Sequence, residues 1–250
     1  MRMIVFKTML GSLFRDAQTL FWSIAFPIGL LIGLGTYFDD PQYSQQLLAG
    51  VLTMSVLFGS LNITAFAVLQ QRNRGVYKLL KATPFSIASF VSCLTGARTV
   101  VGLIVSLVTL LVGMIVFHVA FSVLSLLTLV LILILGTICF VSLGFVAANF
   151  AQNEGQVNMI SNLTGMPMLF LSEAFYSLEN APVWVQVLSK CSPFTYFVQA
   201  TEATVQGDLS SAFFFALILG GFTLFVLSLA VVSFRWDSES KRMIRLGSAN

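Results

Sequence analysis

The stretch VLSLLTLVLILILGTICFVSLGFVAA, residues 123–148, decides the fold class, because none of its 26 residues carries a charge. An α-helix rises about 1.5 Å per residue, so about 20 apolar residues cross the roughly 30 Å hydrocarbon core of a bilayer. Backbone groups in hydrocarbon must be hydrogen-bonded within their own segment, which a helix achieves. The stretch therefore predicts a transmembrane helix.

Comparable apolar stretches lie on both sides of it. The whole chain has 250 residues, of which 57% are hydrophobic and only 9% are charged. Soluble domains carry about 25% charged residues, so most of this chain is surrounded by lipid. We predict an all-α integral membrane protein, one domain over residues 1–250, with six transmembrane helices at about 20–38, 47–69, 97–117, 123–148, 157–175 and 211–234.

The positions of the charges predict the orientation of the six helices. Lys and Arg in short loops stay on the cytoplasmic side. Twelve of the 13 Lys and Arg residues then lie inside, and Lys190 is the exception, whereas Asp39 and Asp40 lie in the first external loop. We expect a multi-pass protein of the plasma membrane with both termini in the cytoplasm. The cations gather at the ends of spans, so the net charge of +3 does not indicate nucleic-acid binding.

Three segments differ from spans and from ordinary loops. Residues 1–18 mix apolar residues with Arg2, Lys7 and Arg15, as an amphipathic helix at the inner interface does. Residues 71–82 predict a short cytoplasmic helix that ends at a Thr-Pro pair. Residues 176–209 contain two apolar runs too short to cross, which predict an external re-entrant helical hairpin. Its aromatic residues at headgroup depth would be Tyr176, Trp184 and Tyr196.

The chain offers little catalytic chemistry. It has no Gly-x-x-x-x-Gly-Lys-Ser/Thr phosphate-binding loop and no His-Glu-x-x-His motif. Its three cysteines are far apart, and its single histidine, His118, has no Cys, Asp or Glu nearby in sequence. We therefore expect no catalytic residue, no metal site and no cofactor in this chain.

Two observations concern a pathway through the protein. Phe58, Asn62 and Phe66 recur every four residues and so share one face of the second span. That face either lines a pathway for amphipathic cargo or packs against a neighbouring helix. Glu173 is the one acidic residue near a span core. It either acts as a gate or substrate contact, or reaches the outer headgroups and water.

The stretch after the second span resembles the ATP-binding-cassette (ABC) type-2 permease family, in which an Arg-x-x-Gly segment is followed by Leu-x-x-Thr-Pro. A second similarity begins at residues 166–172 and continues through residues 182–184 to Ser192-Pro193-Phe194-Thr195-Tyr196. Glu173 stands where the family usually has glycine, and Asn73 where a glutamate is frequent. The residues that match the first motif are Arg72, Gly75, Leu79, Leu80, Thr83 and Pro84.

The resemblance implies partners. Two permease chains, identical or paralogous, would pair and bind two separate ATPase subunits, which hold ATP and Mg in the cytoplasm. The N-terminal helix and the 71–82 helix would transmit motion from the ATPases to a pathway lined by the second and fifth helices. The expected ATPase contacts are Arg72, Arg74, Gly75, Lys78, Leu79, Lys81, Thr83, Pro84 and Glu154. The expected pathway residues are Phe58, Asn62, Phe66, Met166, Met168, Phe170 and Glu173.

The function expected from this resemblance is that of the permease subunit of a bacterial, ATP-driven exporter of drugs, antimicrobial peptides or other amphipathic compounds. An exporter of polysaccharides or lipid-linked glycans with the same fold is the nearest alternative. A channel or secondary carrier that works without ATP is another, although such carriers usually have an acidic residue at mid-membrane. An integral-membrane enzyme is a third alternative, for which the sequence offers no catalytic constellation.

Overall fold

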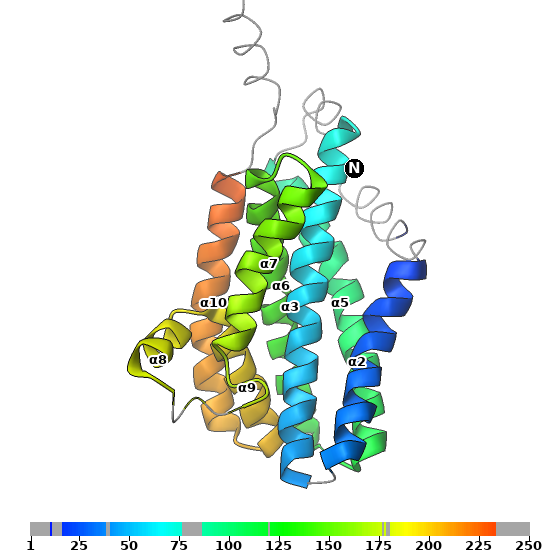
Figure 1. Cartoon of the computed structure of the whole chain (residues 1–250), viewed down its shortest axis with the longest axis vertical. Helices are drawn as coiled ribbons and strands as arrows, with labels where there is room; N and C mark the ends of the chain where they lie inside the picture. Colours follow the sequence, from blue (N-terminus) through cyan, green and yellow to red (C-terminus); the bar gives the residue numbers. More distant parts are fainter. Residues whose placement is uncertain are drawn as a thin grey trace, which may run out of the picture.

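The computed structural model describes residues 11, 17–38, 41–76, 87–119, 121–176, 178 and 181–233, and the regular structure in these residues is α-helical. The helices run side by side over most of their length (Figure 1). They are α2 (Ala17–Phe38), α3 (Pro41–Asn73), α5 (Ile87–Phe117), α6 (Val123–Phe150), α7 (Glu154–Phe170), α8 (Val183–Lys190), α9 (Pro193–Gln206) and α10 (Leu209–Val232).

Five of these helices are long and apolar enough to cross a membrane, namely α2, α3, α5, α6 and α10. They correspond to five of the six predicted spans, which supports the prediction of an all-α membrane protein. The segment of the fifth predicted span, 157–175, forms α7, which has 17 residues and ends at Phe170. The helix ends early because Ser172 donates both its backbone N–H, at 3.3 Å, and its hydroxyl, at 2.7 Å, to the carbonyl oxygen of Leu169.

Two other predicted boundaries were wrong. α5 begins at Ile87 instead of residue 97, because apolar residues precede Arg98 and the helix tolerates this one cation in its fourth turn. The predicted helix at 71–82 does not begin at residue 71, since residues 71–73 complete α3. Gly75 then interrupts the helix with a φ of +72°, a value that side-chain-bearing residues rarely adopt.

Other predictions lie outside the described residues. Of the predicted helix at 71–82, the residues after Val76 lie outside. Of the predicted amphipathic helix at 1–18, only Gly11 and residues 17 and 18, which begin α2, are described. The two short runs of the predicted hairpin at 176–209 do form helices, which are α8 and α9.

α3 lies at the centre of the bundle and packs against α2, α5, α6, α7 and α9 (Figure 1). One apolar cluster joins α3, α6 and α9 and includes Phe140 and Phe197. Another joins α3, α5 and α6 and includes Phe90 and Phe145. Lipid tails are as apolar as these side chains, so close packing holds such helices together more than transfer from water does.

The contact between α3 and α6 depends on one glycine. A Cβ atom added at Gly144 of α6 would lie 2.6 Å from the carbonyl oxygen of Leu61 in α3. The obstructing atom belongs to the backbone of a helix, so it cannot turn aside as a side chain would. Glycine at this position therefore sets how closely the two helices approach.

Buried hydroxyl groups are satisfied mostly within their own helices. Thr53, Thr109, Thr137 and Thr201 each donate to the carbonyl oxygen four residues earlier, at 2.8, 3.0, 2.6 and 2.8 Å. This local bonding lets a polar side chain face an apolar interior without a partner on another helix.

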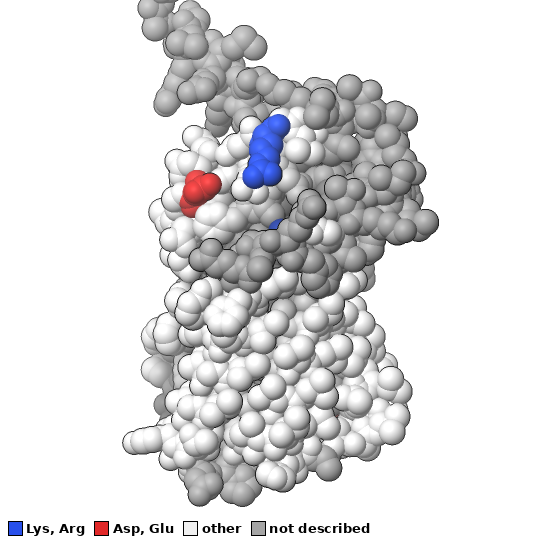
Figure 2. Space-filling model, turned by 90° about the vertical axis from the view of Figure 1, so that its right-hand side faces the viewer, with Lys and Arg blue, Asp and Glu red and all other residues white. Residues whose placement is uncertain are grey.

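The bundle has two distinct ends. At one end lie the end of α3 and the turn between α6 and α7; we call this the Arg72 end. At the other end lie α9 and the start of α10, with α8 beside them (Figure 1). On the face drawn in Figure 2, the charged side chains that are coloured gather near one end, above a wide uncharged surface. An uncharged surface of this kind suits contact with hydrocarbon.

Candidate functional site

A groove runs along α3, and it consists of two adjoining recesses. One recess lies between α2, α3 and α5 and has a volume of about 680 Å³. The other lies between α2, α3 and α7 and has a volume of about 670 Å³. They share the residues Ser23, Ser55, Gly59 and Ile63. We call the two recesses together the α3 groove.

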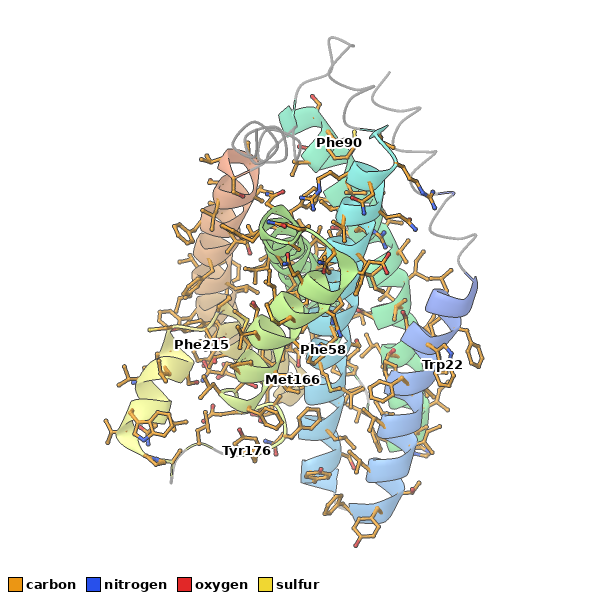
Figure 3. All side chains as sticks on the ribbon, turned by 45° about the horizontal axis from the view of Figure 1, so that its top comes forward. Trp22, Phe58, Phe90, Met166, Tyr176 and Phe215 are labelled. Atoms are coloured by element: carbon orange, nitrogen blue, oxygen red, sulfur yellow. The ribbon has the colours of Figure 1, made fainter. Side chains whose placement is uncertain are left out.

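The recess beside α7 is the apolar half of the groove. Figure 3 labels three of its residues, Trp22 on α2, Phe58 on α3 and Met166 on α7. Trp22 is 61% exposed, so its indole ring is accessible from the surface of the chain. The other apolar side chains of this half are those of Phe26, Pro27, Leu30, Val51, Met54 and Ile63, and Asn162 adds an amide.

The recess beside α5 is the polar half. It contains two guanidinium groups, those of Arg74 and Arg98, and one carboxylate, that of Glu154. Amide and hydroxyl side chains also line it, among them Ser60, Gln70, Gln71 and Ser106, beside apolar residues such as Phe66 and Val105. The groove as a whole is therefore amphipathic, with cations in one half and aromatic and aliphatic side chains in the other.

The structure brings together some of the predicted pathway residues. Phe58 and Met166 line the apolar half, and Phe66 lines the polar half. Asn62 lies one turn from each phenylalanine but lines neither recess. Its Oδ1 atom is buried and has no hydrogen-bond partner in the described chain. The face that the sequence predicted thus contributes two of its three residues to the groove.

The other predicted pathway residues lie elsewhere. Met168 packs against the apolar cluster of α3, α6 and α9. Phe170 is 62% exposed at the end of α7. Glu173 lies in the turn after α7, where its carboxylate accepts a hydrogen bond from Gln199 Nε2 at 3.2 Å. Its backbone oxygen accepts another from Gln46 Nε2 at 3.4 Å, so Glu173 joins α3 to α9 outside the groove.

Glu202 of α9 is close enough to interact electrostatically with Glu173. Burial, and secondarily the negative charge of Glu173, raise the pKa of Glu202 above its ordinary value of 4.5. A hydrogen bond from Gln206 Nε2 at 3.1 Å opposes this shift. The end of the bundle opposite the Arg72 end therefore holds two interacting carboxyl groups.

Arg72 faces into the chain. Its Nη1 donates to the carbonyl oxygen of Ala148 at 3.2 Å, and its Nη2 donates to that of Ala151. Both acceptors lie at the end of α6, where carbonyl groups have no partner within the helix. The positive charge also compensates the negative end of the helix dipole. Arg72 thus fastens the end of α3 to the turn between α6 and α7.

That turn is itself well defined. Asn153 caps α7 by accepting from the backbone N–H of Gln156 at 2.9 Å, and Gln156 Oε1 accepts from the backbone N–H of Gln152 at 2.8 Å. Asn149 donates to Ser233 Oγ at 3.0 Å, which ties the same region to the end of α10. The turn therefore has fixed connections to both α3 and α10.

Arg74, Gly75 and Glu154 lie together at the Arg72 end. Arg74 and Glu154 are exposed and line the same recess. Glu154 is the first residue of α7, where the helix dipole favours a negative charge. The remaining predicted ATPase contacts lie outside the described residues, namely Lys78, Leu79, Lys81, Thr83 and Pro84.

Comparison with protein families identifies the family. A family model described as "ABC-2 type transporter" matches residues 2–205, which is most of the chain. The chain belongs to the ABC-2 type transporter family. This permease is therefore a multi-pass membrane component of an ABC transporter, and its family membership implies ABC ATPase subunits as partners. A comparison with curated proteins found no match.

Several groove residues of this permease were not predicted from the sequence. Trp22 and Phe26 belong to a span that the sequence identified only as apolar. Arg98 was assigned to the cytoplasmic cations, and Ser106 was not singled out. A cation with apolar residues on both sides was the available signal for Arg98, since such residues in membrane helices often mark functional sites.

Proposed function

We propose that this permease is the transmembrane subunit of an ATP-driven exporter and that the α3 groove is part of its substrate pathway. The observation that carries this proposal is the groove itself, which lies against the central helix and has a polar half with charged residues and an apolar half without them. Drugs, antimicrobial peptides and other amphipathic compounds suit such a surface. The apolar half offers few hydroxyl or amide groups, which disfavours a polysaccharide as the cargo.

We propose that α7 is the fifth of six spans, in addition to α2, α3, α5, α6 and α10, and that α8 and α9 form the re-entrant hairpin. The Arg72 end would then face the cytoplasm, with both termini on that side of the plasma membrane of a bacterium. Seventeen residues extend over about 26 Å, which is slightly less than the hydrocarbon core of about 30 Å. The turn at 171–176 would complete the crossing.

We propose that a second permease chain, identical or paralogous, packs against α7. Met159, Leu163, Met166 and Phe170 are all exposed, and their spacing of four, three and four residues is typical of a helix–helix seam. On the same helix Asn162 Nδ2 donates to Asn158 Oδ1 at 2.9 Å. Exposed amides are unfavourable in lipid, and asparagine residues contribute interhelical hydrogen bonds in membranes.

Two ATPase subunits would dock at the Arg72 end and bind ATP and Mg. Arg74, Gly75 and Glu154 are placed to meet them, together with Lys78, Leu79, Lys81, Thr83 and Pro84. Arg72 would act differently, because its guanidinium group is bound to the end of α6. It would transmit a displacement of the ATPase-binding residues that follow α3 to α6 and α7.

The test begins with purification of the tagged permease from its own host membranes and identification of the nucleotide hydrolase that accompanies it. The two proteins are then reconstituted into liposomes, and ATP-dependent movement of amphipathic dyes is measured. We expect transport only when both proteins and ATP are present. Uphill accumulation by the permease alone would contradict the proposal and would favour a secondary carrier.

Within the same assay, Phe58→Ala should change the range of dyes that are transported, because Phe58 lines the apolar half of the groove. Phe213→Ala is the matched control, since Phe213 is 63% exposed on α10. Equal effects of the two substitutions would indicate that the groove is not the pathway.

A further inference from the structure

We propose that the junction of the two recesses is a subsite for the carbonyl group of an amphipathic amide or ester, and that Ser106 binds the carbonyl oxygen. This inference rests on the proposed function in one respect only, which is that the α3 groove is a ligand site. It adds the chemical group by which the ligand is recognised and a residue that selects it.

Ser106 of α5 carries a buried hydroxyl group without a partner. The residue is only 1% exposed and lines the polar half of the groove, and its Oγ atom has no hydrogen-bond partner in the described chain. Thr109, about one turn away on the same helix, donates to the carbonyl oxygen four residues earlier at 3.0 Å. A buried hydroxyl group without a partner is costly, so Ser106 suits a partner that the chain does not supply.

Ser106 differs in position from the other hydroxyl groups of this kind. Three more buried hydroxyl groups lack a partner in the described part of the chain, those of Thr64, Thr95 and Ser161. None of these three residues lines either recess of the groove. Ser106 is therefore the one whose partner can be a molecule bound in the groove.

Two glycines of α5 show how this helix lies against α3. A Cβ atom added at Gly102 would lie 3.9 Å from Ser60 Oγ, and one added at Gly113 would meet the side chain of Leu48. Later positions of α5 thus face earlier positions of α3, so the two helices run in opposite directions. Ser106 follows Gly102 by four residues and lies level with about residue 56 of α3, which is about 6 Å from the level of Ser60.

This level is the junction of the two recesses. Ser55 and Gly59 line both recesses, and each is within one turn of residue 56. Nothing lies within 4 Å of a Cβ atom added at Gly59, so the groove is open here. A ligand that extends from the polar half into the apolar half therefore passes between Ser60 and Ser106.

The subsite lies near the middle of α3. Ser60 is 14 positions from Gln46 and 12 positions from Arg72, which correspond to about 21 Å and 18 Å along the helix. The ester carbonyl groups of bilayer lipids lie at the edge of the hydrocarbon core, about 15 Å from its middle. We therefore expect the carbonyl group at Ser106 to belong to the cargo and not to a lipid of the surrounding bilayer.

A carbonyl oxygen suits two serine hydroxyl groups. It has two lone pairs and accepts two hydrogen bonds, whereas each serine hydroxyl supplies one donor. Because Ser60 and Ser106 are about 6 Å apart along the groove, an oxygen atom between them can lie about 3 Å from each. Such bonds are stronger in a medium of low dielectric constant than in water. The apolar half, which includes Trp22 and Phe58, accommodates the attached alkyl or aryl group.

The experiment uses Trp22 as a reporter, because it lines the apolar half. The full-length permease carrying W184F and W236F, which leave Trp22 as its one tryptophan, is placed in phosphatidylcholine nanodiscs. The N-butyl amide and the butyl ester of a 12-carbon acid with a brominated chain are titrated in, and quenching of Trp22 fluorescence is measured. The comparison probe is the butyl ether with the same brominated chain, which has no carbonyl group.

We expect the amide and the ester to quench saturably, with half-saturation at a mole fraction about tenfold lower than that of the ether. Ser106→Ala should remove most of this preference, and Ser60→Ala should reduce it several-fold. Thr109→Val is the matched control, because the hydroxyl of Thr109 is already bonded within α5, and it should leave the preference unchanged. Ser106→Ala should not lower Tm, because the hydroxyl it removes has no partner in the described chain. If this variant does not fold, Ser60→Ala carries the test.

Three results would overturn the inference. They are equal half-saturation by carbonyl and ether probes, which would indicate water beside Ser106, an unchanged preference in the serine variants, and a lower Tm in Ser106→Ala. Phe58→Ala separates these results from failure of the proposed function, because it should weaken saturable quenching by every probe. A carbonyl preference without ATP-driven transport would count against the exporter and leave the subsite intact. Saturable quenching by none of the probes would contradict both.

Discussion

Arg72 Nη1 donates a hydrogen bond to the carbonyl oxygen of Ala148, which lies 76 residues away in the sequence, at 3.2 Å. A second bond from the same guanidinium group reaches the carbonyl oxygen of Ala151. The planar guanidinium can serve two carbonyl groups at once, which the ammonium group of lysine does less well. This relationship fixes the end of α3 to the end of α6 and gives Arg72 a structural role that its position in a basic stretch of the sequence does not suggest.

Arg72→Gln should therefore lower the stability of the folded permease. Hydrogen bonds from charged groups contribute about 1.5–3 kcal/mol, so we expect a clear decrease in Tm, measured by thermal unfolding in detergent. Arg74→Gln is the matched control, because Arg74 is exposed, and it should change the free energy of unfolding by no more than about 0.5 kcal/mol. Equal losses in the two variants would show that the cap on α6 is unimportant.

Gly75→Ala should weaken the coupling between ATP hydrolysis and transport without preventing membrane insertion. The φ of +72° costs an alanine about 1–2 kcal/mol, although no atom obstructs a Cβ there. Gly75→Asn should be milder, because asparagine tolerates this conformation better. The measurement is ATPase activity and dye transport of the reconstituted complex. Normal coupling in Gly75→Ala would mean that the break after α3 does not matter for transmission.

Gly144→Ala should destabilise the bundle, because the added Cβ atom would meet the carbonyl oxygen of Leu61. Overpacking of this kind costs about 1–3 kcal/mol, and we expect a lower Tm together with broader elution in size-exclusion chromatography. Gly221→Ala on α10 is the control, since nothing lies within 4 Å of its Cβ position. A Tm for Gly144→Ala as high as that of the control would show that α3 and α6 can separate at little cost.

Leu163→Cys should form disulfide cross-links between permease chains, because the exposed face of α7 is proposed to meet a second copy. The experiment requires replacement of Cys93, Cys139 and Cys191, followed by oxidation in membranes and electrophoresis. Leu217→Cys is the control, since Leu217 is 69% exposed on α10. Cross-linking at 217 but not at 163 would place the contact between permease chains on another face.

The burial of Glu202, together with the nearby charge of Glu173, predicts a pH-dependent stability. The pKa of Glu202 is raised in the folded protein, so the folded state binds its proton more tightly than the unfolded state does. Its stabilising effect is complete below the unfolded value of 4.5 and is lost as the pH rises through the folded pKa. Tm in detergent should therefore fall as the pH rises above 4.5, and Glu202→Gln should reduce that slope.

Glu173→Gln separates the two causes of the shift. It removes the negative charge but leaves the burial of Glu202, which is the larger cause, so the slope should decrease only in part. If Glu173 also contacts substrate or acts as a gate, the same variant changes the range of transported compounds. The pKa of Asp208 is lowered, mainly by a hydrogen bond with Ser211, and its effect lies below pH 3.8, outside this window.

The spans could be predicted because hydropathy is a local property, and their boundaries were harder because helix ends depend on single contacts. The sequence located α2, α3, α5, α6 and α10. It extended α7 to residue 175, because the bonds from Ser172 to Leu169 that end this helix leave no hydropathy signal. It placed Arg72 in a separate short helix at 71–82, whereas Arg72 belongs to the last turn of α3, which a positive φ at Gly75 follows.

The groove could be predicted only in part. Phe58 and Phe66 were found from their spacing on one helix, since periodicity identifies a shared face. Trp22 and Arg98 lie on other helices, and a single sequence without aligned relatives does not tell which helices are neighbours. The proposed contact face on α7 was not predicted either, because apolar residues have the same sequence pattern whether they face lipid or another protein chain.

One helix joins the two ends of the bundle. Gln46, near the start of α3, contacts Glu173, and Arg72, near its end, contacts α6. The two residues are 26 positions apart, which is about 39 Å along a helix, and proline occurs in α3 only as its first residue. A helix of this kind behaves as a stiff rod. A displacement of α3 applied at Arg72 would therefore reach Glu173 and Glu202 at the opposite end of the bundle almost undiminished. No other element would be needed to connect the two ends.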